Sequence, residues 1–198
     1  ATTEARNFPV RTDLTLYSTM AIVNEYMGNY ERQATYLCSD IDYSLQAFEN
    51  NIACLGKAYY NNGNYAEAIE VYERFFEVMN VIFKNECPPP YHDFDSGDCY
   101  LLLAQAYLAV GEEKKAMDAV ESSIMYYINF LKKETDHENY YPIVVCSPIV
   151  KKREFKQRIR KDIIKKRLQN KLSDKCIEKL NQNTRFIELF DMVNEIAE

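Results

Sequence analysis

This sequence lacks tryptophan and contains few histidines, glycines and prolines. Two histidines, five glycines and six prolines in 198 residues are typical of long helices joined by few turns. No apolar run approaches the roughly 18 residues of a membrane span. The six cysteines are scattered without a C-x-x-C pair, which favours reduced thiols over a disulfide scaffold. The polar N-terminal segment has no signal-peptide core, so we expect a cytoplasmic protein.

Catalytic motifs are missing as well. The sequence has no Gly-rich phosphate loop, no nucleophile elbow and no zinc-helix motif, and its histidines, His92 and His137, fall in segments that read as loops. We therefore predict that the protein is not an enzyme and needs no cofactor. Six potential metal ligands lie within 13 residues, but their spacing matches neither a four-ligand zinc site nor a complete calcium loop, so no metal is expected. These residues are Cys87, His92, Asp93, Asp95, Asp98 and Cys99.

The net charge of −6 conceals a strong asymmetry along the chain. Residues 1–150 hold 10 basic and 22 acidic side chains, whereas residues 151–171 hold 11 basic and two acidic ones. The sequence predicts a helix from about Ile149 to Leu172 with one apolar stripe, so that the cations share the remaining face. The basic face comprises Lys151, Lys152, Arg153, Lys156, Arg158, Arg160, Lys161, Lys165, Lys166, Arg167 and Lys171. Solvation, contact with the acidic repeats and polyanion binding all remain open for this face.

Two stretches share one pattern of large, small and aromatic residues followed by a turn glycine. The first contains Leu55-Gly56, Tyr59 and Gly63, and the second contains Leu103-Ala104, Tyr107 and Gly111. Small residues let two helices approach closely, and glycine tolerates the left-handed conformation at the end of a helix. The pattern resembles the tetratricopeptide repeat, a helix–turn–helix unit of about 34 residues.

The resemblance implies an all-α fold of antiparallel helical hairpins stacked in a right-handed superhelix. Alignment on the turn glycines predicts three repeats within residues 1–133, at about 14–48, 49–82 and 97–130. A Pro-rich insertion occupies 83–97, with a helix start near Asp98 and an N-cap at Asp95 or Ser96. Residues 134–198 are expected to form a connector and C-terminal helices at about 149–172, 173–181 and 184–197 that close the array.

The resemblance also implies function, because the concave surface of such arrays binds other chains. We expect a non-catalytic scaffold for a protein or peptide ligand, recognised by side-chain amides and tyrosines. Registration against the family predicts groove positions on all three repeats. They are Ser18, Ile22, Glu25, Tyr26, Asn50, Lys57, Tyr60, Asn61, Leu101, Gln105 and Leu108.

Two other functions remain open at this stage. The chain, which does not begin with Met, is compatible with the peptide-sensing half of a bacterial helix-turn-helix regulator whose DNA-binding domain lies upstream. Alternatively, residues 151–171 could make it a polyanion-binding accessory protein, although no nucleic-acid recognition motif is present and nucleic acid is not the expected partner. A homodimer also remains open, as does the alternative that the groove residues only pack against the C-terminal helices.

Overall fold

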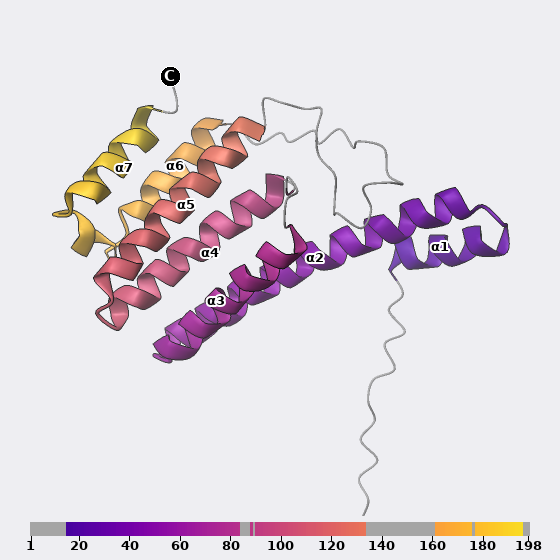
Figure 1. Ribbon diagram of the computed structural model, residues 1–198, viewed down its shortest axis with the longest axis horizontal. Coiled ribbons are helices and arrows are strands. Elements are labelled where there is room, and N and C mark those ends of the chain that lie inside the picture. Colours follow the sequence, from indigo (N-terminus) through magenta and orange to yellow (C-terminus); the bar gives the residue numbers. More distant parts are fainter. Residues whose placement is uncertain (1–14, 84–87, 89, 134–160, 176, 196–198) are drawn as a thin grey trace, which may run out of the picture.

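The computed structural model describes residues 15–83, 88, 90–133, 161–175 and 177–195. Within these residues the chain is all-α and has no strand, as the sequence predicts. Helices α1 (Leu16–Tyr26), α2 (Tyr30–Asn61), α3 (Tyr65–Ile82), α4 (Pro90–Ala109) and α5 (Glu113–Lys133) precede α6 (Lys161–Leu172), the short 3₁₀ turn η1 (Glu178–Leu180) and α7 (Thr184–Glu195). Successive helices lie side by side in antiparallel order from α2 to α5 (Figure 1).

Three of the turns between helices share one backbone geometry. Gly28, Gly63 and Gly111 have φ values of 68°, 81° and 82°. At each turn the glycine N–H donates to a carbonyl three residues earlier, and the next N–H donates to a carbonyl five residues before it. This arrangement satisfies free carbonyls at the helix end and requires the left-handed conformation that glycine adopts most easily. The prediction of three glycine turns is therefore confirmed.

Helix α2 is longer than the repeat alignment predicts. It continues through residues 48 and 49, where the sequence predicts a boundary between two repeats, and reaches 32 residues. Its middle contains neither glycine nor proline, so nothing in residues 44–54 stops the helix. At about 1.5 Å per residue it measures roughly 48 Å. The two helices expected on either side of residue 48 are thus collinear, and the first part of α2 extends with α1 away from the other helices (Figure 1).

Helix α4 begins eight residues earlier than predicted. Pro90 is its first residue, a position where proline is favoured because its fixed φ suits the helix and its missing N–H needs no partner there. The predicted start near Asp98 and the predicted N-cap at Asp95 or Ser96 were wrong. The consequence is that His92, which the sequence places in a loop, is buried in a helix.

Close helix contacts build the core where the sequence has small residues. A Cβ atom at Gly56 would lie 2.3 Å from Cζ of Tyr72, so only glycine allows α2 and α3 this approach. The Tyr72 hydroxyl donates to the carbonyl of Ala53, 3.2 Å away. Between α3 and α4 the rings of Phe76 and Tyr100 stack with centroids 3.6 Å apart and planes 13° from parallel. These contacts belong to one continuous hydrophobic cluster that extends from α2 to α7.

The C-terminal helices extend this core. Leu168 and Leu172 of α6 and Phe186 and Leu189 of α7 are buried in the same cluster. The prediction of a helix near 184–197 is met by α7, but residues 173–175 and 177–181 form turns, a bend and the 3₁₀ turn η1 rather than the predicted helix. Residues 149–160 of the predicted basic helix lie outside the described part of the chain.

Candidate functional site

The predicted groove positions on α2 are accessible. Asn50, Lys57 and Asn61 are exposed, and Tyr60 is half-buried with its ring 5.2 Å from that of Tyr65. The spacing from Asn50 to Lys57 and Asn61 places these residues along one side of the helix. This side therefore presents two amides and one cation to solvent.

The predicted groove positions on α4 differ in their exposure to solvent. Gln105 is partly exposed, but Leu101 and Leu108 are buried in the core cluster. Asp98, one turn before Leu101, contacts two side chains of α6, so the C-terminal helices cover this side of α4. The two leucines are therefore not available to a ligand in this structure, whereas Gln105 is.

The predicted positions on α1 also divide into two groups. The Ser18 hydroxyl donates to the carboxylate of Asp40, as does the Thr15 hydroxyl, and these bonds hold α1 against α2. Ile22, Glu25 and Tyr26 are exposed. Ser18 thus stabilises the hairpin, and the other three side chains face solvent.

The described part of the basic face contacts the acidic body of the protein. Arg167 donates to Oδ2 of Asp98 at 2.7 Å, and its guanidinium lies 4.7 Å from the ring centroid of Phe94. Lys171 forms an ion pair with the other oxygen of Asp98. Burial lowers the pKa of Lys171, and the Asp98 carboxylate opposes this shift. Two cations of the face are therefore already paired, and Lys166 is exposed.

An open hollow of about 430 Å³ lies beside these ion pairs. It is lined by one helix and the residues just after it: Lys166, Arg167, Asn170, Lys171 and Asp174. Its cations suit a carboxylate or another anion, although Arg167 and Lys171 share their charge with Asp98. Lys165 is half-buried, six further predicted basic residues, 151–153, 156, 158 and 160, lie outside the described residues, and the side chain of Lys161 is not described.

Sequence reasoning missed a buried polar cluster between α2 and α4. Nδ1 of His92 lies 2.5 Å from Oε1 of Glu49, and Nε2 of the same ring lies 3.3 Å from the Ser96 hydroxyl. All three side chains are buried. Glu49 lies four residues after Leu45 and seven before Gly56, in a buried stripe, and this position is the signal that could have revealed it.

The surroundings of this cluster are aromatic and acidic. The ring centroid of Phe83 lies 4.4 Å from that of His92. The Tyr91 hydroxyl donates to Asp42 at 2.7 Å and adds a second link between α4 and α2. Burial, followed by the nearby charges of Glu49 and Asp98, raises the pKa of Asp95 to about 7.

The order of Glu49, His92 and Ser96 is that of a hydrolytic triad, but the environment differs from that of an active site. The Ser96 side chain is fully buried, so a substrate cannot reach its hydroxyl in this conformation. Neither the 430 Å³ hollow beside α6 nor a second hollow between α6 and α7 is lined by these residues. Among the described residues, no three His, Cys, Asp or Glu side chains are grouped to hold a metal ion. The cluster therefore connects two helices.

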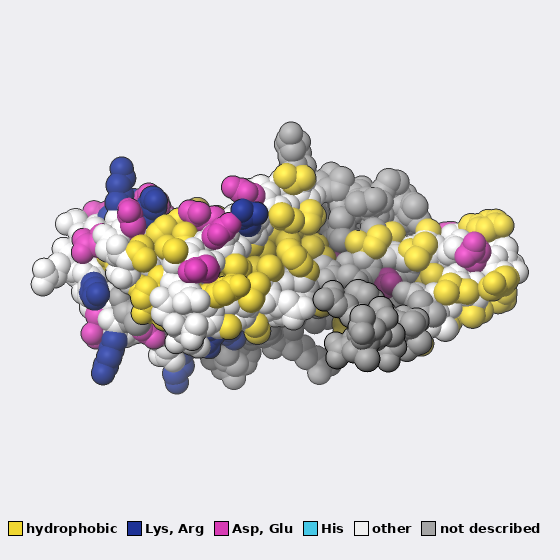
Figure 2. All heavy atoms as spheres, turned by 90° about the horizontal axis from the view of Figure 1, so that it is seen from below, with side chains coloured by type: hydrophobic (Ala, Val, Ile, Leu, Met, Phe, Trp, Pro, Cys, Tyr) yellow, Lys and Arg dark blue, Asp and Glu magenta, His cyan; other side chains and the backbone are white. Residues whose placement is uncertain are grey.

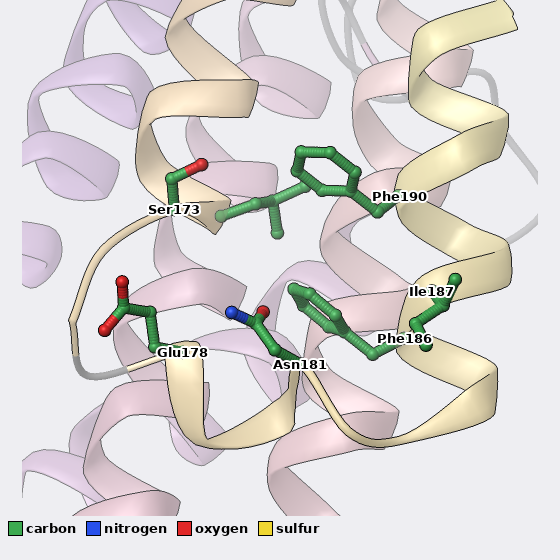
Figure 3. A pocket seen from close by; sticks show the side chains of 7 residues that line it. Ser173, Glu178, Asn181, Phe186, Ile187 and Phe190 are labelled. Atoms are coloured by element: carbon green, nitrogen blue, oxygen red, sulfur yellow. The ribbon is translucent and has the colours of Figure 1, made fainter.

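A second hollow of about 340 Å³ lies between the end of α6, η1 and α7 (Figure 3). Leu172, Phe186 and Phe190 form its apolar side, and the two phenyl rings lie 6.2 Å apart. Ser173, Glu178 and Asn181 contribute the polar groups at its other side (Figure 3). This hollow lies at the end of the helical array.

Comparison with known families identifies one segment of the chain. The tetratricopeptide repeat model matches residues 52–79, which comprise the second part of α2, the Gly63 turn and most of α3. The chain carries a tetratricopeptide repeat. In this repeat Gly56 and Ala68 are the small residues of the facing helices, and Tyr72 fills the space beside Gly56. No curated protein and no solved structure matches the chain.

The first and third repeats remain predictions, because the family model matches only the second. The hairpins α1–α2 and α4–α5 share the glycine turn of the tetratricopeptide repeat, and all described helices pack as neighbours. None of the described helices is long and apolar enough to cross a membrane. The fold and the repeat together indicate a protein-interaction module.

Proposed function

We propose that this protein is a non-catalytic module that binds a protein or peptide segment along the inner surface of its repeats. The observation that carries the proposal is the exposed row Asn50, Lys57 and Asn61 on the helix that begins the tetratricopeptide repeat. Amides can form hydrogen bonds with both the N–H and the C=O groups of an extended backbone. A rigid helix holds them at fixed spacing, which lowers the ordering cost of binding.

The surface continues from α2 to α4 through Gln105, and the cations around the 430 Å³ hollow of α6 provide an electropositive region at the C-terminal end. A ligand with an acidic residue or a free carboxylate fits this distribution, because Lys57 and Lys166 are both exposed. Leu101 and Leu108 are not included in the proposed site, since both are buried.

The polyanion alternative is less well supported for the described residues. Asp98 pairs with both Arg167 and Lys171, and Arg185 of α7 pairs with Asp118 and Glu121 of α5. These contacts use cations to attach C-terminal helices to the acidic repeats. No structural observation favours the alternative of a regulator with an upstream DNA-binding domain.

The test is selection of displayed peptides against the full chain, followed by affinity measurement on purified variants. The groove variant carries Asn50→Ala, Lys57→Glu and Asn61→Ala, and the control carries Glu77→Ala on the exposed side of α3. We expect the groove variant to bind the selected peptides at least tenfold more weakly, which corresponds to about 1.4 kcal/mol, and the control to bind them normally. Equal binding by all three proteins would place the site elsewhere.

A further inference from the structure

The long helix α2 exposes an apolar stripe that the described helices cover only in part; Phe48, whose ring lies 6.4 Å from that of Phe75 of α3, is its least exposed member. Five large side chains recur along it at intervals of seven, four, seven and seven residues, so they share one face of the helix. They are Tyr30, Leu37, Ile41, Phe48 and Leu55, and each is more than one third exposed. The neighbouring α1 adds further exposed apolar side chains, and Figure 2 shows hydrophobic side chains gathered over this end of the molecule, on the right.

A comparison of α2 with α3 and α4 of the same chain indicates what should cover this stripe. The turn glycines align the first part of α2 with α3, and its second part with α4. Leu103 of α4, which lies three residues after the Tyr100 that stacks on Phe76 of α3, is 4% exposed, whereas its counterpart Leu55 is 44% exposed. Phe76 of α3 is 7% exposed, whereas its counterpart Ile41 is 43% exposed. The first part of α2 therefore leaves exposed the face that α3 packs against α4. The second part leaves exposed the face that α4 packs against α3.

These two faces are complementary but cannot meet within one chain. Packing α3 against α4 requires a turn between them, and α2 runs straight through the corresponding position. Two antiparallel copies of α2 related by a twofold axis solve this problem, because the first part of each then covers the second part of the other. Such an isologous contact satisfies both pairs of faces at once.

We propose that a second copy of this chain occupies the stripe and forms a symmetric dimer through antiparallel α2 helices. The Phe76–Tyr100 stack between α3 and α4 sets the register. The counterparts of these residues are Ile41 and Ile52, so Ile41 of one copy contacts Ile52 of the partner copy, and the axis passes near residues 46 and 47.

Area and charge both fit a second copy. The five stripe side chains present on the order of 500 Å² of surface, and the exposed apolar side chains of the adjacent α1 bring the total to the order of 1,000 Å². A standard stable interface buries about 800 Å² per partner. The five stripe side chains are uncharged, so contact between two copies buries no ionised side chain of the stripe, and the nearby carboxylate of Asp40 is bound by two hydroxyls.

Sedimentation equilibrium of the full chain tests the dimer directly. The expected mass is twice the 23.2 kDa of one chain. Ile41→Glu places a charge in the contact of both copies and should weaken the dimer at least 100-fold, giving monomers that retain their helical circular dichroism. The matched control is Val78→Glu on α3, which alters an equally exposed apolar residue outside the stripe and should stay dimeric. A monomeric wild-type chain overturns the proposal.

A photo-crosslinking amino acid at position 41 tests the register. In a mixture of isotopically labelled and unlabelled chains, crosslinks between two chains should map to residues near 52. Crosslinks confined to a single chain, or a dimer crosslinked elsewhere, overturn the antiparallel α2 contact. The dimer contact does not overlap the proposed ligand site, because Lys57 lies two residues from Leu55 and hence on the opposite side of α2. Monomeric Ile41→Glu should therefore still bind selected peptides.

Discussion

His92 of α4 and Glu49 of α2 form a buried pair, with Nδ1 of the ring 2.5 Å from Oε1 of the carboxylate. The second oxygen of Glu49 has no hydrogen-bond partner among the described residues. A buried carboxylate with only part of its bonding capacity satisfied depends strongly on the partner that it has. This pair fixes the early turns of α4, which the sequence placed in a loop, against the long helix.

Changing both members of this pair should destabilise the fold by less than the sum of the two single changes. We expect Glu49→Ala to lower the free energy of unfolding by about 3 kcal/mol, because it leaves a cavity and strands the imidazole. The double variant Glu49→Leu, His92→Leu should lose less than the sum of the single variants. Urea unfolding followed by circular dichroism measures these values. Additive losses would show that the two side chains act independently.

The pH dependence of stability should report Asp95. Its pKa is raised to about 7, first by burial and then by Glu49 and Asp98. The folded state therefore holds the proton more tightly than the unfolded state, whose pKa is near 3.8. Stability from this group is present below about pH 4 and is lost as the pH rises towards 7.

Asp95→Asn should remove this dependence. After allowance for the partial exposure of the side chain, we expect the variant to be about 1–2 kcal/mol more stable than wild type at pH 8 and equal to it near pH 4. Urea titrations at a series of pH values provide the measurement. A constant difference at all pH values would mean that packing, and not ionisation, separates the two proteins.

Sequence patterns predicted the local features of the fold well. The glycine turns depend on a conformation that few other residues adopt, and the predicted close approach at Gly56 depends on the absence of a Cβ atom. Both are properties of single residues and their nearest neighbours along the chain. For that reason they could be recognised without knowledge of the tertiary structure.

The errors arose where distant segments decide the outcome. Whether α2 breaks near residue 48 depends on whether its two parts gain more by packing together than by continuing as one helix, and the sequence between them contains no stop signal. Leu101 and Leu108 are buried in a cluster that also includes residues of α6 and α7, and a repeat alignment does not place those two helices. The Pro-rich segment was assigned to a loop as a whole, although proline at a first helical position favours a helix.

Gly56→Ala should test the close contact between α2 and α3. The added Cβ would lie 2.3 Å from the Tyr72 ring, so the ring or a helix must move, at a cost of about 1–3 kcal/mol. Combining the change with Tyr72→Leu, which makes room for the methyl group, should restore part of the lost stability relative to Tyr72→Leu alone. Thermal unfolding compares the four proteins. If Gly56→Ala proves neutral in the wild-type background, the proposed close approach is incorrect.

Asp98 should anchor the C-terminal helices more firmly than Asp118 does. Asp98 pairs with both Arg167 and Lys171 of α6 and its side chain is 17% exposed, whereas Asp118 pairs with Arg185 of α7 and is 55% exposed. Solvent weakens the exposed pair, so Asp118→Asn should change stability by less than about 0.5 kcal/mol. Asp98→Asn leaves two cations without their shared partner and should cost about 1–2 kcal/mol.

Hydrogen–deuterium exchange resolves where this loss occurs. In Asp98→Asn the amides of α6 should exchange faster than in wild type, while those of α3 should remain unchanged, because α6 can detach without opening the repeat. Asp118→Asn serves as the matched control, since it removes the same negative charge from the body of the repeats. Salt should narrow the difference between Asp98→Asn and wild type only slightly, because partly buried pairs are poorly screened. Equal exchange of α6 in both variants would show that packing of Leu168 and Leu172, rather than the ion pairs, holds this helix in place.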